Sequence, residues 1–251
     1  KKFVQSSPYN VGIDTAILMN PEVWVASGHV GGFNDPLMDC KSCKTRYRAD
    51  QLIEAHMEAK GETPEAIDSW GNEKMEAYIA DESIKFVQCG AHNFTNIRQF
   101  NLMFKTFQGV VEDTSTEIFL RPETAQGIFV NFLNVQKTTR QKIPFGIAQI
   151  GKAFRNEIIA RQFIFRMREF EQMEMPFFVR PGEEMQWYKY WKEAGMQWHK
   201  AIGSSADKLR YHDHENLAHY ANAAVDIQFE FPFGFKEIEG IHSRTDFDLK
   251  Q

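Results

Sequence analysis

Two long segments with the alternation of a β-strand, residues 145–157 and 164–179, most constrain the fold of this chain. A short loop separates them, so they are expected to pair as neighbours in one sheet. Helical spacing of apolar residues predicts helices over 124–136 and 183–202, and strict alternation predicts a half-buried strand over 226–231. Strands interleaved with helices in this way predict an α+β fold, an antiparallel β-sheet flanked by helices.

The apolar stripes of the two predicted helices are expected to face the core. They consist of Ala125, Phe129, Phe132 and Leu133 on the first helix and of Tyr188, Trp191, Trp198 and Ile202 on the second. Nearer the N-terminus, residues 10–24 predict a strand that Pro21 ends, because proline cannot donate to a ladder. A loop is expected at 27–32, and the polar stretch 41–85 predicts a helical insertion outside the core.

Basic residues concentrate on the two paired segments and their loop. From Lys137 to Arg168 the chain has eight Lys and Arg, including Arg161, against one acid, a local charge of +7 within a chain of net charge −5. A solvated sheet face is the simplest explanation. An isolated basic segment in an acidic chain favours an anionic ligand instead, and arginine suits phosphate because its planar fork binds two oxygens. The sequence has no Gly-rich phosphate loop, which argues against a Rossmann or P-loop site.

An ordered set of short motifs then gives a family resemblance that covers nearly the whole chain. Phe154-Arg155-Asn156-Glu157, followed after a loop by Phe165-Arg166-Met167-Arg168-Glu169-Phe170-Glu171-Gln172-Met173-Glu174, resembles motif 2 of the class II aminoacyl-tRNA synthetases, in the form found in dimeric glycyl-tRNA synthetases. Other segments resemble the same family: Asn20-Pro21 with Ser27-Gly28-His29 at the end of motif 1, Tyr47-Arg48-Ala49-Asp50, Phe100-Asn101-Leu102-Met103-Phe104, Arg121-Pro122-Glu123-Thr124-Ala125-Gln126 and Glu237-Ile238-Glu239-Gly240-Ile241.

The resemblance implies an ATP site with two catalytic arginines. Arg155 would clamp the α-phosphate and stabilise the charge that develops there, and Arg166 would meet the outer phosphates. Phe170 would stack on the adenine, and Glu237 would help to hold Mg²⁺ through ATP. The residues implied for ATP binding are Arg155, Asn156, Glu157, Phe165, Arg166, Met167, Arg168, Glu169, Phe170, Glu237 and Ile238.

The resemblance also implies glycine as the amino acid. Because glycine has no side chain to bind, selection must exclude larger amino acids while holding the ammonium and the carboxylate. The implied glycine-binding residues are Arg48, Glu123, Phe170, Glu171, Gln172, Met173 and Glu174. From the sequence alone, Glu123 is equally consistent with a helix-start carboxylate, Arg48 with a surface ion pair, and His29 with either a substrate-side loop or a packed histidine.

The cysteines predict a candidate zinc site. Cys40 and Cys43 have the spacing of a zinc knuckle, and Cys89 with His92 would complete a Cys₃His set. Members of the family carry two C-x-x-C pairs in this insertion, but here Phe86 stands where a fourth cysteine would complete the second pair. Reduced cysteines in a surface insertion are the alternative.

Composition and motif order set the remaining expectations. Three cysteines cannot form a disulfide framework, and no run approaches the roughly 18 apolar residues of a membrane span, so a cytoplasmic protein without membrane contact is expected. A pI near 5.9 argues against a DNA-coating protein.

The expected domains are 1–39, the start of the core with the end of motif 1; 40–99, the insertion; and 100–251, the core with motif 2. Motif 3 and the anticodon-binding domain are expected after Gln251, so the chain is expected to be a piece that does not charge tRNA alone.

The function implied by the resemblance is that of a glycine–tRNA ligase. Such an enzyme activates glycine with ATP to glycyl-adenylate and transfers the glycyl group to the 3′ end of tRNA(Gly), here as a homodimer built through motif 1. Two alternatives share the fold: a non-charging paralogue that binds nucleotide or RNA, and an adenylate-forming amide ligase. The paralogue is disfavoured by the joint presence of Arg155, Glu157, Arg166, Phe170 and Glu237, and the amide ligase by Glu171 and Glu174.

Overall fold

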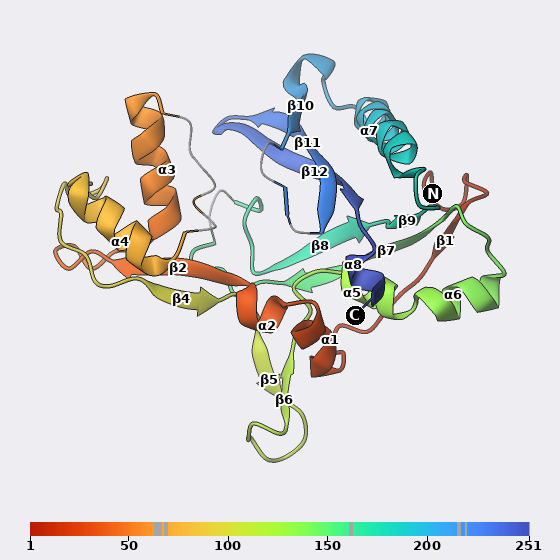
Figure 1. Cartoon of the computed structure of the whole chain (residues 1–251), viewed down its shortest axis with the longest axis horizontal. Helices are drawn as coiled ribbons and strands as arrows, with labels where there is room; N and C mark the ends of the chain where they lie inside the picture. Colours follow the sequence, from red (N-terminus) through yellow and green to blue (C-terminus); the bar gives the residue numbers. More distant parts are fainter. Residues whose placement is uncertain (63–66, 68–69, 161–162, 215–216, 219, 251) are drawn as a thin grey trace. The chain divides into compact units, whose positions relative to one another are not determined.

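The computed structural model describes residues 1–62, 67, 70–160, 163–214, 217–218 and 220–250 (Figure 1). The chain divides into two compact units, each assembled from separated segments. Unit 1 consists of Lys1–Ser27, Glu123–Ala153 and Glu169–Gln251, and unit 2 consists of Gly28–Pro122 and Phe154–Arg168. The motif 2 segment is therefore divided, with its loop in unit 2 and its second strand in unit 1.

Unit 1 contains two β-sheets. The first has the order β1-β7-β8 with β9 also paired to β7, and the second has the order β10-β11-β12. The strands are β1 (Asn10–Gly12), β7 (Phe145–Phe154, whose last residue belongs to unit 2), β8 (Glu169–Glu174), β9 (Phe177–Phe178), β10 (Leu209–Asp213), β11 (Ala221–Phe231) and β12 (Gly234–Arg244). Because β1 runs parallel to β7, the first sheet is mixed, whereas a purely antiparallel sheet was predicted. The second sheet is antiparallel throughout.

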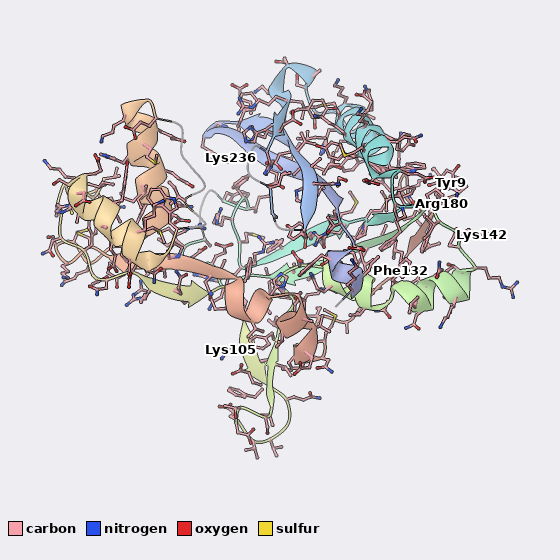
Figure 2. The ribbon with its side chains drawn as sticks, viewed as in Figure 1. Tyr9, Lys105, Phe132, Lys142, Arg180 and Lys236 are labelled. Atoms are coloured by element: carbon pink, nitrogen blue, oxygen red, sulfur yellow. The ribbon has the colours of Figure 1, made fainter. Side chains whose placement is uncertain are left out.

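Helices cover these sheets. They are α1 (Pro21–Ala26), α5 (Ala125–Val130), α6 (Phe132–Thr139), α7 (Glu184–Ala201) and α8 (Phe247–Lys250), with a 3₁₀ helix at Ala206–Lys208. α7 packs on β11 and β12 (Figure 1). Phe132 of α6 is labelled in Figure 2. The centre of its ring lies 4.5 Å from that of Phe178 and 5.6 Å from that of Phe145, on the first sheet. These rings, with buried Ile128 and Ile147, form one hydrophobic core.

Unit 2 is built on a three-stranded sheet of order β3-β2-β4 and a β5-β6 hairpin. Its strands are β2 (Asn34–Asp39), β3 (Arg46–Arg48), β4 (Arg98–Asn101), β5 (Lys105–Phe107) and β6 (Glu117–Phe119), and its helices are α2 (His29–Gly32), α3 (Ala49–Lys60) and α4 (Asn72–Asp81). Ile53 of α3 and Ile79 of α4 pack with Met38 of β2 in a second hydrophobic core. The predicted helical insertion is thus confirmed as helical, and it has a core of its own.

The prediction of a strand over 10–24 was wrong after Gly12. Pro21 begins α1 instead of ending a strand, because Asn20 Oδ1 accepts a hydrogen bond from the Glu22 amide (3.0 Å) and caps the helix. Proline is favoured at the first helical position, where no amide donor is needed. The predicted loop at 27–32 also ends in a short helix, α2, after Gly28 adopts a φ of +81°.

The predicted helix over 124–136 is two helices. They separate at Asn131, whose backbone (φ −97°, ψ 3°) leaves the helical region, and the first begins at Ala125. The expected inward face is confirmed for Ala125 and Phe132, but Leu133 is exposed, because the break changes the direction of the second helix.

The two paired segments are shorter than predicted. β7 stops at Phe154, and 164–179 holds two strands, β8 and β9, rather than one. Arg155 and Glu157 therefore lie outside any strand, as do Arg166 and Arg168, so the alternation predicted over 145–157 and 164–179 does not extend to them. Alternation is confirmed within β8, where Phe170, Gln172 and Glu174 are half-buried and Glu169, Glu171 and Met173 are exposed. Arg161 lies outside the described residues.

The helix over 183–202 and the strand over 226–231 are confirmed, the strand extending back to Ala221. The aromatic stripe of the helix is half-buried rather than core, Ile202 is exposed, and the buried positions are Gly195, Met196 and His199. Asp226, expected on the exposed side, is buried because His214 Nε2 pairs with its carboxylate (2.9 Å). Within the described residues, no helix is both long and apolar enough to cross a membrane.

Candidate active site

Arg155 is held by the backbone of unit 2. Its Nε donates to the Pro122 carbonyl (3.2 Å), and its amide donates to the Arg168 carbonyl (2.9 Å). Its guanidinium carbon lies 5.4 Å from the centre of the Phe33 ring, within the range of a cation–π contact. The next residue, Asn156, donates its amide to the Leu102 carbonyl (2.8 Å). These contacts orient the cationic group of Arg155.

Arg166 and Arg168 bind residues at the start of the loop that follows Arg155. Arg166 Nη1 pairs with Glu157 Oε2 at 3.1 Å. Arg168 donates from Nε to the Glu157 carbonyl (2.8 Å) and from Nη2 to the Ile158 carbonyl (3.1 Å). The guanidinium of Arg168 thus joins the end of the loop to its start, and Glu157 and Arg166 form an ion pair in which the two charges cancel.

Arg48 belongs to a partly buried ion cluster. Its Nη1 lies 2.9 Å from Asp35 Oδ1, and its Nε and Nη2 bind the two carboxylate oxygens of Asp50. Asp35 is 5% exposed and Asp50 is 1% exposed. Burial raises the pKa of Asp35, and the Arg48 charge opposes that rise. The alternative of a simple surface ion pair for Arg48 is therefore wrong.

In unit 1, Glu174 of β8 faces the segment before α5. Its Oε2 accepts hydrogen bonds from the Thr124 amide (2.9 Å) and from the Thr124 hydroxyl, and Gln172 Oε1 accepts a weaker one from the same amide (3.2 Å). Burial raises the pKa of Glu174 to about 7, and the nearby Glu123 charge acts in the same direction. The Thr124 hydrogen bonds and the Arg244 charge oppose the rise. Two acidic groups, Glu123 and Glu174, therefore share this site, and the pKa of Glu174 is about 7.

The alternative role of Glu123 as a helix-start carboxylate is not what the structure has. Thr124 occupies the N-cap position of α5, and no acid lies in the first turn of that helix. His29 begins α2, with its ring 5.4 Å from that of Phe33, which is the packed arrangement.

Glu237 and Ile238 lie on β12 at an irregularity in the sheet. Glu239 pairs with Ile227 and Glu237 with Gln228, which leaves Ile238 as the extra residue of a bulge. A Cβ on Gly240 would lie 3.0 Å from Glu237 Oε1, so the glycine leaves room for that carboxylate. Glu239 is anchored separately, 2.8 Å from His199 Nε2 of α7.

The predicted site residues fall into two groups. Unit 2 holds Arg48, Arg155, Asn156, Glu157, Phe165, Arg166, Met167 and Arg168, and unit 1 holds Glu123, Glu169, Phe170, Glu171, Gln172, Met173, Glu174, Glu237 and Ile238. Within unit 2 the structure joins Glu157 to Arg166 and Arg168, and within unit 1 it joins Gln172 and Glu174 to Thr124. Glu171 and Met173 point to the other face of β8 from Glu174.

Four residues of these clusters were missed from the sequence. Asp50 and Thr124 stand inside segments that resemble the family, but they were not selected as site residues, and Asp35 lies outside those segments. Arg244 is also unpredicted: it pairs with Asp248 at 2.6 Å and lies 3.9 Å from the centre of the Tyr220 ring. Its position, six residues after Ile238 on the same strand, is the one clue that the sequence held.

The three cysteines form a candidate metal centre in unit 2. The sulfurs of Cys40, Cys43 and Cys89 lie within 4.8 Å of one another, and those of Cys40 and Cys89 are 3.6 Å apart. Hydrogen bonds to the side chain and backbone of Thr45 lower the pKa of Cys43 to about 7. Among the described residues His92 is not in the group, and its Nδ1 donates to the Ile84 carbonyl (2.7 Å). Phe86 is buried, so that position serves the hydrophobic core.

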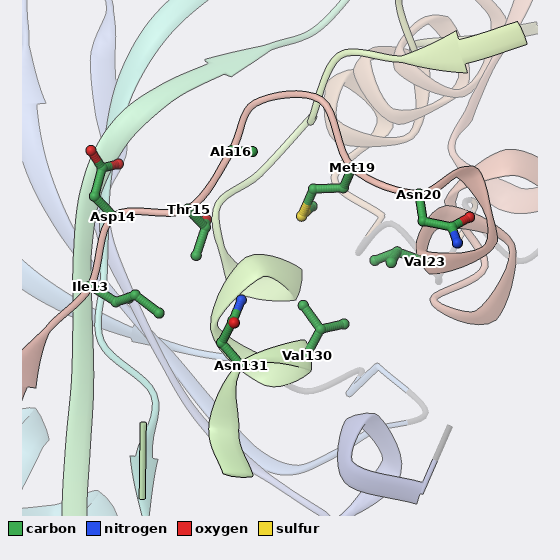
Figure 3. A pocket seen from close by; sticks show the side chains of 9 residues that line it. All are labelled: Ile13, Asp14, Thr15, Ala16, Met19, Asn20, Val23, Val130 and Asn131. Atoms are coloured by element: carbon green, nitrogen blue, oxygen red, sulfur yellow. The ribbon is translucent and has the colours of Figure 1, made fainter. Parts of the chain in front are cut away.

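A cavity of about 520 Å³ lies in unit 1 beside the predicted motif 1 segment (Figure 3). Ile13, Met19 and Val23 line one side and Val130 and Asn131 of α5 and its cap line the other (Figure 3). Next to it, Thr15 donates to Gln149 Oε1 (2.8 Å), and a Cβ on Gly127 would collide with the Thr15 side chain. The chain just before the segment that resembles motif 1 is therefore packed, through Thr15, directly on the helix that follows Glu123.

Comparison with known proteins shows which family has this fold. The family model described as "tRNA synthetase class II core domain (G, H, P, S and T)" matches residues 74–248. The chain belongs to this family. A second family model, "Glycyl-tRNA synthetase insertion domain 1", matches residues 35–69, which include Cys40 and Cys43. The α+β fold predicted from the motifs is therefore confirmed as that of a class II synthetase core.

The curated relatives that the chain matches carry names from the same family. The chain is 61% identical over 253 residues to a protein named Glycine--tRNA ligase from Caldanaerobacter subterraneus subsp. tengcongensis, covering 100% of this chain and 55% of that protein. It is 60% identical to the same-named protein of Alkaliphilus oremlandii, over 100% of this chain and 54% of that protein. The chain thus spans about half the length of these relatives. The predicted resemblance to glycyl-tRNA synthetases is confirmed.

Among solved structures, the chain is similar to the cytoplasmic serine-tRNA ligase from Naegleria fowleri in complex with AMP. The identity is 15% and the TM-score is 0.47, with 59% of this chain and 32% of that chain covered.

Proposed function

We propose that the full-length protein containing this chain is a glycine–tRNA ligase. The observation that supports this most directly is the identity of about three residues in five, across the whole chain, to proteins of that name. Two features, each taken within its own unit, are consistent with it: Arg155 donates to the Pro122 carbonyl in unit 2, and Glu174 lies near Glu123 in unit 1. Adenylate formation requires a cation at the α-phosphate and an anion for the substrate ammonium.

In the proposed first step, a glycine carboxylate oxygen attacks the α-phosphorus of ATP. A new P–O bond forms as the bond to the β-phosphate oxygen breaks, giving glycyl-adenylate and pyrophosphate. Arg155 would stabilise the negative charge that grows on the α-phosphate oxygens, and no protein nucleophile is needed. In the second step, a hydroxyl of the terminal tRNA ribose attacks the glycyl carbonyl and AMP leaves.

The remaining residues would bind and orient the substrates. Glu157 and Phe170 are proposed to hold the adenine, and Arg166 the outer phosphates. Glu123 and Glu174 are proposed to bind the glycine ammonium. Glu237 is a hard oxygen ligand, suited to Mg²⁺ that enters with ATP.

A glycine-dependent ATP–pyrophosphate exchange assay on the full-length protein tests the proposal. Exchange with glycine and with no other amino acid is the expected result, followed by transfer of labelled glycine to tRNA(Gly). Exchange with another amino acid alone would refute the specificity. No exchange with any amino acid would favour the non-charging paralogue, and adenylate formation without transfer to tRNA would favour the amide ligase.

We also propose that Cys40, Cys43 and Cys89 bind zinc. Three thiol sulfurs within 4.8 Å of one another fit a tetrahedral Zn²⁺ site with one further ligand, and the low pKa of Cys43 favours the thiolate that the metal requires. The metal would be structural, because closing Cys40 and Cys43 onto Cys89 ties β2 to the segment before β4.

Elemental analysis is expected to find about one zinc per chain. Cys89→Ser should lose the metal and lower the melting temperature of the insertion, whereas His92→Gln should retain the metal, because His92 lies outside the group of three sulfurs. Equal zinc content in wild type and Cys89→Ser would rule out this site.

Partners and location follow the same proposal. tRNA(Gly), glycine and ATP are the proposed ligands, and a homodimer built through the motif 1 segment and a cytoplasmic location remain predictions. The cavity beside Met19 and Val130 puts an apolar surface next to that segment.

A further inference from the structure

Glu237 and Glu239 of β12 point to opposite faces of the second sheet. They are two residues apart, so regular alternation would place both on one face. Glu239 lies opposite Ile227 of β11. Glu237 lies opposite Gln228, so Ile238 is the extra residue of a bulge. Because directly opposite residues share a face and the two partners on β11 are consecutive, the bulge separates the two carboxylates.

α7 covers the face on which Glu239 lies (Figure 1). His199 Nε2 of α7 donates to Glu239 Oε2 (2.8 Å), and His199 is 6% exposed. Gly195 lies one turn earlier on the same side of the helix. A Cβ on Gly195 would lie 2.9 Å from Glu239 Oε1, which is closer than side chains pack, so the glycine leaves room for the carboxylate. The helix therefore presents one place, formed by His199 and Gly195, that fits Glu239.

Glu237 lies on the face of the sheet away from α7. Gly240 is opposite Asp226 in the register of β11 and β12. A Cβ on Gly240 would lie 3.0 Å from Glu237 Oε1 and 3.7 Å from Asp226 Oδ1. The Glu237 carboxylate is therefore directed over Gly240, on the side where Asp226 lies. This direction depends on the bulge, because a bulge re-aims the side chains beside it.

α7 is fixed on the sheet independently of Glu239. Tyr211 Oη of β10 donates to the Lys192 carbonyl (3.1 Å), and Lys192 Nζ lies 2.7 Å from Asp213 Oδ1 of the same strand. Lys192 precedes His199 by about two turns of helix. His199 thus has a defined position from which it holds Glu239.

The hydrogen bond from His199 to Glu239 decides which residue of β12 is the extra one. Glu239 takes the position opposite Ile227, which is 0% exposed, and a carboxylate without a partner there would be costly. Ile238 is half-buried and apolar, so it would take that position if Glu239 lost its donor. The bulge would then move by one residue, and the strand beside Glu237 would bend and twist differently.

We propose that His199 is a positioning residue for Glu237, acting through Glu239 and the bulge at Ile238. The proposal rests on the proposed function, in which Glu237 binds the Mg²⁺ that enters with ATP. α7 supplies none of the predicted site residues, yet it would control the direction of a nucleotide-site carboxylate from the other face of the sheet.

The test uses the full-length protein and measures ATP binding by equilibrium dialysis over a range of Mg²⁺ concentrations, together with the melting temperature. His199→Leu should raise the Mg²⁺ concentration for half-maximal ATP binding about tenfold, a usual loss when a group behind a metal ligand is removed. His199→Gln should keep that concentration within about threefold of wild type, because its amide can still donate to Glu239.

A double variant tests whether His199 acts through Glu237. Glu237→Gln alone should raise the half-maximal Mg²⁺ concentration about tenfold or more, because a carboxylate ligand is lost. Adding His199→Leu should raise that concentration by no more than about a further twofold, while it still lowers the melting temperature.

Met196→Ala is the matched control, because Met196 is a buried apolar residue of the same helix. It should lower the melting temperature through the cavity that it leaves and change the Mg²⁺ dependence by less than about twofold. If His199→Leu fails to fold, Gly195→Ala replaces it, because the added methyl displaces the Glu239 carboxylate while alanine favours the helix. It should raise the half-maximal Mg²⁺ concentration by a smaller factor.

A lower melting temperature in His199→Leu with unchanged Mg²⁺ dependence would overturn the proposal, since that is the result of a purely structural role. An equal Mg²⁺ effect in Met196→Ala, or full additivity of His199→Leu with Glu237→Gln, would overturn it as well. If wild type catalyses no exchange with any amino acid, the proposed function fails, but the ATP-binding measurement still decides the role of His199.

Discussion

Arg155→Ala is expected to reduce glycine-dependent pyrophosphate exchange by about 10²–10³-fold, the usual loss when one group that stabilises transition-state charge is removed. The loss should appear in kcat more than in the KM for ATP, because the charge on the α-phosphate grows only as the new bond forms. The structure supports this role, since the Pro122 carbonyl and the Phe33 ring orient the Arg155 guanidinium.

Lys142→Ala is the control for Arg155→Ala. Lys142 belongs to the same basic stretch but is exposed and lies between α6 and β7 (Figure 2). If general positive charge attracted ATP, both variants would lose activity. We expect exchange by Lys142→Ala to stay within about twofold of wild type, and equal losses in the two variants would remove Arg155 from its proposed role.

Periodic segments were predictable because a single physical rule determines them. α7 and β8 each present one more buried face, and a repeat of 3.6 or 2 residues records that face in the sequence. The ends were less predictable. β7 was expected to continue to Glu157, but Arg155 leaves the sheet because its amide and side chain bind the Arg168 and Pro122 carbonyls, which no local pattern records.

The site was predictable only as far as its motifs are contiguous. The run 170–174 was identified, but alternation divides it between two faces, so that Glu174 meets Thr124 while Glu171 is exposed. Two of the metal-site cysteines were evident from spacing. That His92 lies outside the group of three sulfurs depends on tertiary structure, which the spacing of residues along the chain does not record.

Glycine affinity should depend on pH through Glu174. Burial and the Glu123 charge raise the pKa of Glu174 to about 7, so this carboxyl is mostly protonated at pH 6 and mostly ionised at pH 8. An ammonium binds better to two carboxylates than to one. The KM for glycine should therefore be several-fold higher, up to about tenfold, at pH 6 than at pH 8, with a midpoint near the Glu174 pKa.

Glu174→Gln identifies the group responsible. It should raise the KM for glycine at pH 8 by about tenfold or more and abolish the pH dependence, because the amide cannot ionise yet can still accept the Thr124 hydrogen bonds. Glu171→Gln, on the opposite face of β8, should keep both the low KM and its pH dependence. If the KM for glycine of Glu174→Gln keeps its pH dependence, another group titrates. If Glu171→Gln loses the pH dependence instead, the ammonium site lies on the exposed face of β8. Only the first pattern agrees with a site in which Thr124 holds one carboxylate at the start of α5 and Glu123 supplies the second.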